Sequence, residues 1–150
     1  MASWAEFATA EPDFAARVKD RFAIRKHKTL ATLRRDGSPR ISGIEVEIDG
    51  DQVLVGMMPG SVKLRDLERD ARLALHSPTE DPPADDPRGW AGEAKISGRA
   101  VPLVKPPAAG GHSFRVDIAE VVLTHLNESG DRLVIESWHA NRGFRRTERS

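Results

Sequence analysis

The chain of 150 residues contains no cysteine and no tyrosine, and its aromatic side chains are limited to five phenylalanines and three tryptophans. Without cysteine, disulfide bonds, thiol catalysis and cysteine-ligated metal sites are excluded. With so few aromatic residues, the core has to be built mainly from valine, isoleucine, leucine and alanine. A chain of this composition often completes its burial by dimerising, so we expect a homodimer.

Neither sign of charge is in excess, because lysine plus arginine and aspartate plus glutamate both total 23. A general nucleic-acid binder needs a basic excess, so no nucleic-acid partner is expected. No apolar run approaches the roughly 20 residues of a membrane span. The N-terminal sequence MASWAEF has neither the basic nor the apolar region of a signal peptide. We therefore expect a cytoplasmic protein without a membrane partner.

Several motifs that would identify a catalytic site are also missing. There is no G-x-S-x-G, P-loop or G-x-G-x-x-G sequence, so hydrolase, nucleotide-triphosphatase and Rossmann functions have no support. The five histidines form no H-x-x-x-H or H-x-H pair, and no metal site is expected. Among them, His76 ends a predicted strand and is the candidate to face a ligand cleft, the alternative being an ordinary core or surface histidine.

Residues 1–28 are predicted to form an N-terminal helical segment. Ser3 and Glu6 have the spacing of a capping box, which opens a first helix. A second helix should start at Glu11-Pro12-Asp13, because apolar residues then recur with helical spacing. The basic run 25–28 is expected to lie at the end of this helix, as a solvated helix end or, alternatively, a ligand site.

Residues 29–150 are predicted to form one domain that is mainly β, a small barrel. Asp36-Gly37 and Asp49-Gly50 mark tight hairpin turns, so the first three strands form an antiparallel meander. A helix follows at Ser61–Asp70, between strands three and four. The expected strands, about seven in all, are Thr29–Leu33, Arg40–Ile48, Gln52–Met57, Leu73–His76, Ala94–Leu103, Ser113–Leu126 and Arg132–Trp138. Closure into a small barrel removes most strand edges.

Three segments are expected to lack regular structure. Residues 78–92 are rich in proline and aspartate and are long for a connection, which suggests a mobile flap or a functional loop. Lys105–Gly111 consists of turn residues. The tail Asn141–Ser150 carries four arginines and is expected to be a solvated end, or a source of cations for a partner subunit or an anionic ligand.

The most informative stretch surrounds Ser61 and Lys63. Ser61 is a suitable N-cap, and Lys63 falls in the first helical turn, where free N–H groups already make a positive end. A cation in that turn is useful if an anion binds there. The residues therefore suggest a phosphate-binding corner, and the alternative is a simple cap with Lys63 directed into water.

Three segments together resemble the pyridoxamine 5′-phosphate oxidase-like family, the flavin- and deazaflavin-binding split barrels. They are TLATLRRDGSPRISGIEVEIDGDQVLVGMMPGSVKLRDLERDARLALHS, GEAKISGRAVPL and LVIESWHANRGFRRTER, and the resemblance spans roughly residues 29–149. It implies a homodimer with cofactor sites at the dimer interface and FMN or coenzyme F(420) as cofactor. The family's S-x-K motif contacts the cofactor phosphate, and Ser61 and Lys63 match it.

The chain also departs from this family. FMN-binding members carry an Arg and a Lys on the second strand, where Ser42 and Glu47 stand here, and Arg40 is the candidate substitute because it shares a strand face with Ser42. Met57 stands where a Thr is usual. The remaining candidates for cofactor binding are Met58 beside the ring, His76, Trp138 near the ring or the dimer seam, and Arg142 or Arg145 of the tail.

Some of these residues also have an ordinary structural alternative: core filling for Met57 and Met58, and burial for Trp138. No side chain stands out as a nucleophile or a base. The sequence therefore suggests a small homodimeric oxidoreductase with an unidentified substrate. The alternatives are a carrier that binds cofactor without turnover and a structural dimer that has lost cofactor binding.

Overall fold

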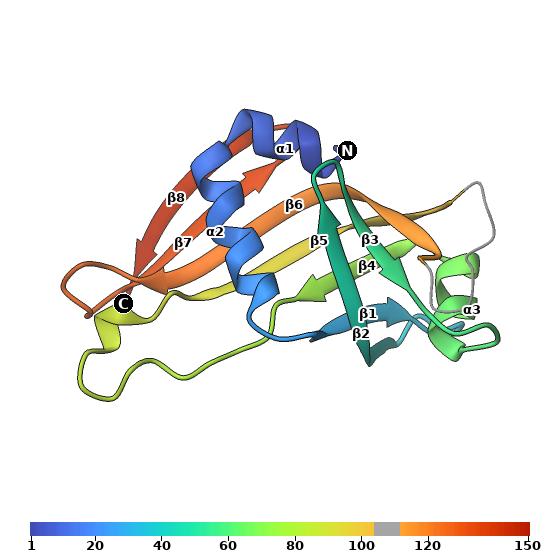
Figure 1. Ribbon diagram of the computed structural model, residues 1–150, viewed down its shortest axis with the longest axis horizontal. Coiled ribbons are helices and arrows are strands. Elements are labelled where there is room, and N and C mark those ends of the chain that lie inside the picture. Colours follow the sequence, from blue (N-terminus) through green and yellow to red (C-terminus); the bar gives the residue numbers. More distant parts are fainter. Residues whose placement is uncertain (104–111) are drawn as a thin grey trace.

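The computed structural model describes residues 1–103 and 112–150, so the predicted linker Lys105–Gly111 lies outside the described residues. The described chain is mostly antiparallel sheet with three α-helices (Figure 1). The helices are α1 (Trp4–Ala10), α2 (Pro12–Ala23) and α3 (Val62–Arg69). The strands are β1 (His27–Leu33), β2 (Pro39–Asp49), β3 (Gln52–Gly56), β4 (Arg72–His76), β5 (Glu93–Pro102), β6 (Phe114–Leu126), β7 (Leu133–His139) and β8 (Gly143–Arg149).

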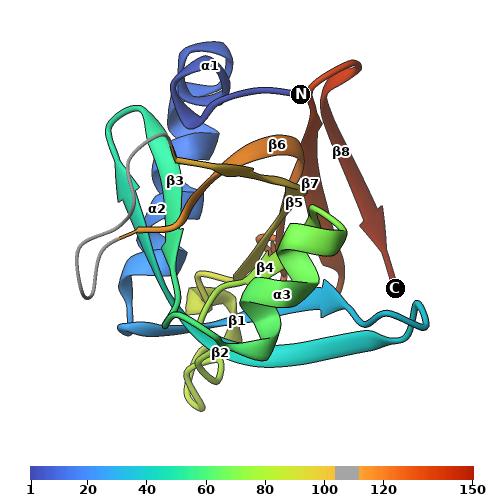
Figure 2. The same ribbon diagram turned by 90° about the vertical axis from the view of Figure 1, so that its right-hand side faces the viewer.

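Six strands close into a barrel in the order β3-β2-β1-β4-β5-β6. Closure comes from β3 pairing with β6, through Leu54 opposite Arg115 and Val55 opposite Phe114. Strands β7 and β8 continue the sheet beyond β6, and α3 lies at one end of the barrel (Figure 2). The predicted split barrel, with one helix between strands three and four, is confirmed.

Local sequence signals explain several of these elements. The capping box is present, with Ser3 Oγ accepting from the Glu6 N–H at 3.1 Å. Gly37 and Gly50 have positive φ angles of 88° and 28°, as the two hairpin turns require. The register of β5 against β6 shifts at Gly98, where a Cβ atom would clash with the carbonyl oxygen of Asp117. Gly98 therefore lies at a β-bulge.

The core fills the barrel and the space beneath α1 and α2. Alternate residues of the strands point inward, as expected from the period-two pattern, and the largest fully buried ones include Leu30, Val55, Leu75, Ile96 and Ile118. Beneath the helices the few aromatic rings gather. Phe7 contacts Trp4, Phe14 and Trp138, with ring centroids 5.0–5.7 Å apart.

Two sequence expectations were wrong. The tail does not lack regular structure: it forms β8, which pairs with β7 from His139 opposite Gly143 to Leu133 opposite Arg149, while most of its residues remain exposed. The described chain thus has eight strands instead of seven. The basic run 25–28 only partly follows the helix as a solvated end, because its last two residues already belong to β1, which begins at His27. Lys28 is buried, and its Nζ donates to the Lys26 carbonyl oxygen at 3.0 Å.

The connection between β4 and β5 contains only a single 3₁₀ turn, Pro87–Gly89. It is tied to α2 by Arg21, which pairs with Glu80 at 2.6 Å, and to the residues just after α2 by Arg25, which donates to the Thr79 carbonyl oxygen at 2.6 Å. The Trp90 indole also donates to the Glu80 carbonyl oxygen at 3.0 Å. Within the described residues, no helix is long and apolar enough to cross a membrane.

Candidate functional site

The start of α3 has the geometry that the sequence suggested. Ser61 is the N-cap, and its Oγ accepts from the Leu64 N–H at 3.3 Å. Val62 and Lys63 form the first turn, where backbone N–H groups have no acceptor within the helix. Lys63 is half-buried and forms no ion pair within residues 1–103 and 112–150. Cap and cation therefore stand together at the positive end of the helix dipole.

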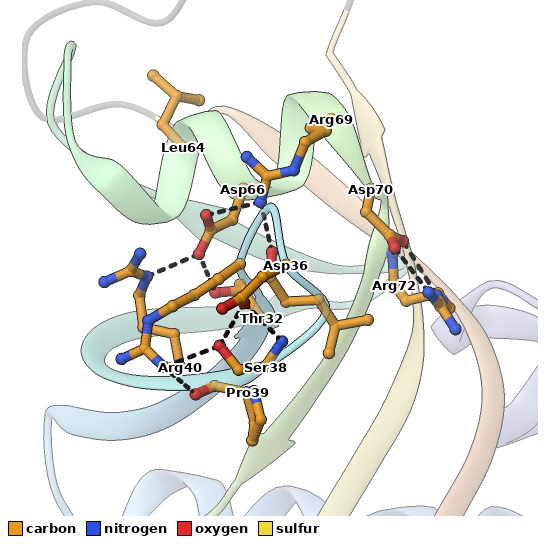
Figure 3. A network of polar contacts seen from close by, with 12 residues as sticks. Thr32, Asp36, Ser38, Pro39, Arg40, Leu64, Asp66, Arg69, Asp70 and Arg72 are labelled. Atoms are coloured by element: carbon orange, nitrogen blue, oxygen red, sulfur yellow. Dashed lines mark hydrogen bonds and ion pairs between the residues drawn. The ribbon is translucent and has the colours of Figure 1, made fainter.

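A buried carboxylate fixes α3 against the barrel. Asp66 is 2% exposed and lies at the centre of a polar network (Figure 3). It accepts hydrogen bonds from Thr32 Oγ1 of β1 at 2.8 Å, from Arg40 Nε of β2 at 2.7 Å and from Arg69 Nη2 at 3.0 Å. Burial alone would raise the pKa of Asp66, but these hydrogen bonds outweigh it and lower the pKa to about 2.

This network also positions Arg40, one of the predicted site residues. Only its Nε binds Asp66, and its side chain remains 26% exposed. In the described part of the chain, its two terminal amino groups carry no hydrogen bond. Ser42 lies two residues further along β2 on the same face as Arg40, opposite Leu30 of β1. Arg40 is thus held beside α3 with donors to spare.

A cavity of about 400 Å³ lies on the outer face of the barrel. Its lining is mostly apolar and comes from β1, β2, β4, β5 and β6: Thr29, Ala31, Ile41, Ala74, Leu75, His76, Lys95, Ile96, Ser97, Glu120 and Val122. His76 therefore faces a cleft, as the sequence suggested. Its Nδ1 lies 2.6 Å from the Ser77 carbonyl oxygen, and its Nε2 lies 3.7 Å from Glu93 Oε2.

The other predicted residues are spread over the molecule. Met57 packs against the margin of the core and Met58 is 79% exposed, both in the loop that leads to α3. Trp138 is buried against Phe7. Arg142 is exposed at the β7–β8 turn and lines a cavity of about 120 Å³ with Glu120, Ser137, His139, Gly143 and Arg145. Six candidates thus lie on β2, on α3 or in the loop that leads to α3, whereas His76, Trp138 and Arg142 lie on other parts of the chain.

Sequence reasoning missed Asp66, the residue that links α3 to Arg40. The only available signal was a carboxylate between Leu64 and Leu67 on the helix that carries the apolar stripe. It also missed Lys95 and Glu120 of the cavity, because cross-strand neighbours emerge only from the register. No cluster of three or more His, Asp or Glu able to hold a metal occurs among the described residues.

Comparison with known proteins gives matches in structure only. Neither family models nor curated proteins match this chain. A pyridoxamine 5′-phosphate oxidase-related FMN binding protein from Nostoc punctiforme is 9% identical, with a TM-score of 0.62 over 97% of this chain and 99% of that one. An F(420) reductase is 18% identical, with a TM-score of 0.50 over 69% and 94%.

A heme binding protein from Mycobacterium smegmatis is also similar, with 13% identity and a TM-score of 0.52 over 89% of this chain and 87% of that one. The chain has the split-barrel fold of the pyridoxamine 5′-phosphate oxidase-like proteins. Identities this low establish the fold of the split barrel alone. These three proteins are named for different ligands, FMN, F(420) and heme, so the ligand of this split barrel has to be argued from its own residues.

Proposed function

We propose that this split-barrel protein is a homodimeric oxidoreductase that uses FMN or coenzyme F(420). The observation that carries the proposal is the start of α3, where the N-cap Ser61, Lys63 and the free N–H groups occupy the same first turn. Arg40, held to the same helix through Asp66, adds a guanidinium with unused donors. This set of donors fits a phosphate group, which accepts several charge-assisted hydrogen bonds.

Each residue has a defined part in this proposal. Ser61 and Lys63 bind the phosphate and Arg40 assists, while Ser42, Met57 and Met58 border the same corner. The bound cofactor supplies the hydride chemistry, and the protein supplies binding and orientation. No nucleophile on the protein is needed, which agrees with the lack of such a motif in the sequence.

Dimerisation is proposed to occur through the outer face of the barrel. Ile41 projects from β2 on this face and is 76% exposed, beside the apolar cavity. A second copy covering this face would bury Ile41 and bring a second set of residues, Arg142 among them, to the seam. We expect wild type to sediment as a dimer and Ile41→Lys to sediment as a monomer with unchanged circular dichroism. A monomeric wild type would contradict this part of the proposal.

The proposal is tested by titrating cofactor-free protein with FMN and with coenzyme F(420), followed by fluorescence. Lys63→Ala should weaken binding of the preferred cofactor roughly tenfold, since a charge-assisted contact with phosphate is lost. It should leave the free energy of unfolding unchanged. Arg65→Ala, an exposed position on the same helix, is the matched control and should bind like wild type.

The outcomes separate the candidate functions. Equal affinity of wild type and Lys63→Ala would refute the role given to Lys63. Binding without turnover in a redox assay would favour the second candidate, a cofactor carrier, which is supported by the absence of a cation at Ser42 and Glu47 on β2. In the structure Glu47 instead lies 2.6 Å from His112. If neither cofactor binds, the remaining candidate is a structural dimer that has lost cofactor binding.

A further inference from the structure

The floor of the outer-face cavity is made by two rows of paired residues. The register places Thr29, His76, Lys95 and Val122 in one row across β1, β4, β5 and β6, and Ala31, Ala74, Ser97 and Glu120 in the next. Successive members of a row lie about 5 Å apart. Thr29, Ala31 and Ala74 are small, so a planar ring can lie close to the backbone there. The charged and basic groups stand at the side, on β4, β5 and β6.

The hydrogen bond of His76 defines which ring nitrogen is available. The Ser77 carbonyl oxygen can only accept, so Nδ1 carries a proton and the neutral ring has its lone pair on Nε2. Glu93 Oε2 is 3.7 Å from Nε2, which is too far for a hydrogen bond, so this carboxylate does not occupy the lone pair of Nε2. His76 can therefore accept a proton at Nε2 from a molecule in the cavity.

Lys95 lies directly opposite His76 on the neighbouring strand and lines the same cavity. In the described part of the chain, its ammonium group has no ion-pair partner. A ligand that gives a proton to His76 would thus hold its negative charge next to Lys95. Glu120, in the neighbouring row, disfavours a second negative charge on the ligand.

We infer that this cavity binds a planar conjugated molecule with one acidic hydroxyl group, a phenol or an enol, and that His76 takes the hydroxyl proton. The ligand O–H bond breaks, an Nε2–H bond forms on His76, and the ligand oxyanion pairs with Lys95. No oxidant is required for this step. This inference rests on the proposed function, because the ligand would be either a substrate of the oxidoreductase or a cofactor whose ring carries an acidic hydroxyl group.

The test uses 4-nitrophenol, whose phenolate is yellow, and 4-nitrotoluene, which has nearly the same shape but no hydroxyl. We expect cofactor-free protein to bind 4-nitrophenol roughly tenfold more tightly than 4-nitrotoluene and to shift its absorbance toward the phenolate. His76→Gln and Lys95→Gln should each remove most of this preference and the colour change. Lys19→Gln, at an exposed position on α2, is the control and should behave like wild type.

A further variant, Ala74→Trp, fills the floor without changing a charge and should abolish binding of both probes. Thermal unfolding of each variant verifies that it is folded. Equal binding of the two probes to wild type, no binding of either, or unchanged colour in both His76→Gln and Lys95→Gln would overturn the inference.

Competition identifies the source of the ligand. Displacement of 4-nitrophenol by FMN or coenzyme F(420) assigns the cavity to the cofactor ring, whereas simultaneous binding assigns it to a substrate; both results support a site in this cavity. The 4-nitrophenol titration tests the cavity separately from the corner at α3, because neither Ser61 nor Lys63 lines this cavity. If 4-nitrophenol fails to bind, the cofactor titration still tests the proposed function separately.

Discussion

Two buried carboxylates, Asp66 and Glu136, hold helices against the sheet in different ways. Asp66 binds two arginines and a threonine hydroxyl and fixes α3 at the end of the barrel. Glu136 of β7 binds Arg17 of α2 through both carboxylate oxygens, at 2.9 and 3.0 Å, and lies 2.6 Å from His125 Nε2. Both side chains are less than one-tenth exposed.

The comparison separates a contact that supports the fold from one that also supports the candidate site. Asp66 holds Arg40 against α3, so its loss should affect both folding and phosphate binding. Glu136 contacts no residue that we assign to cofactor binding, and its loss should affect folding alone. The arginine that binds Glu136 is also more exposed to solvent than the one that binds Asp66: the Arg17 side chain is 45% exposed, whereas that of Arg40 is 26% exposed.

The largest effect is expected for Asp66→Ala. It leaves Arg40, Arg69 and Thr32 without their shared acceptor, and we expect the free energy of unfolding to fall by about 3 kcal/mol in urea titrations. Cofactor affinity should fall in the same variant. Asp70→Asn, which removes only an exposed pair with Arg72, should change either quantity far less. A variant with wild-type stability would show that α3 is not held by this carboxylate.

Glu136→Gln should cause the second-largest loss in the free energy of unfolding. The amide keeps the shape but loses the charge that binds Arg17 and His125, so we expect about 1–2 kcal/mol of destabilisation, measured in the same way. Cofactor affinity should be unchanged, in contrast with Asp66→Ala. Reduced affinity in Glu136→Gln would mean that α2 contributes to the binding site, and the distinction between the two carboxylates would fail.

Acid should reveal a smaller difference between the two groups. The pKa of Asp66 is lowered from 3.8 to about 2, and that of Glu136 is also lowered, because hydrogen bonds and positive charges outweigh burial. A lowered pKa stabilises the folded state above the unfolded-state value, and the contribution is lost as pH falls through the folded value. For Asp66 this loss lies between about pH 4 and pH 2.

The free energy of unfolding of wild type should therefore decline over this interval. Asp66→Asn should reduce this pH dependence of the free energy of unfolding. Glu136→Gln should reduce it less, because solvent screens the ion pair between Arg17 and Glu136. Urea titrations at a series of pH values measure these slopes. Equal slopes in wild type and Asp66→Asn would show that Asp66 does not titrate over this range.

Local signals predicted the fold well. The turns at Gly37 and Gly50, the capping box at Ser3 and the cap at Ser61 each depend on residues close in sequence, and each is confirmed. β8 was missed because its sequence, GFRRTER, has no apolar alternation: it is an edge strand stabilised by its pairing with β7, not by burial.

The candidate site was harder to predict because its contacts join distant parts of the chain. Ser61 and Lys63 were found from helix-start chemistry, but Thr32, Arg40 and Asp66 meet only through the packing of α3 on β1 and β2. His76 was singled out, whereas Lys95 became its neighbour only through the β4–β5 register. The sequence offers no local pattern that encodes such pairings.

Among the described strands, β8 ends the sheet, because it pairs only with β7, whereas β3 at the other end of the strand order pairs with both β2 and β6. An open edge can recruit a strand from another molecule and start an aggregate. Four of the seven residues of β8 are charged: Arg145, Arg146, Glu148 and Arg149. The charges of β8 therefore disfavour pairing with a strand of another molecule. A chain cut before Gly143 would leave the more apolar β7 as the edge strand, with its backbone groups unpaired on that side.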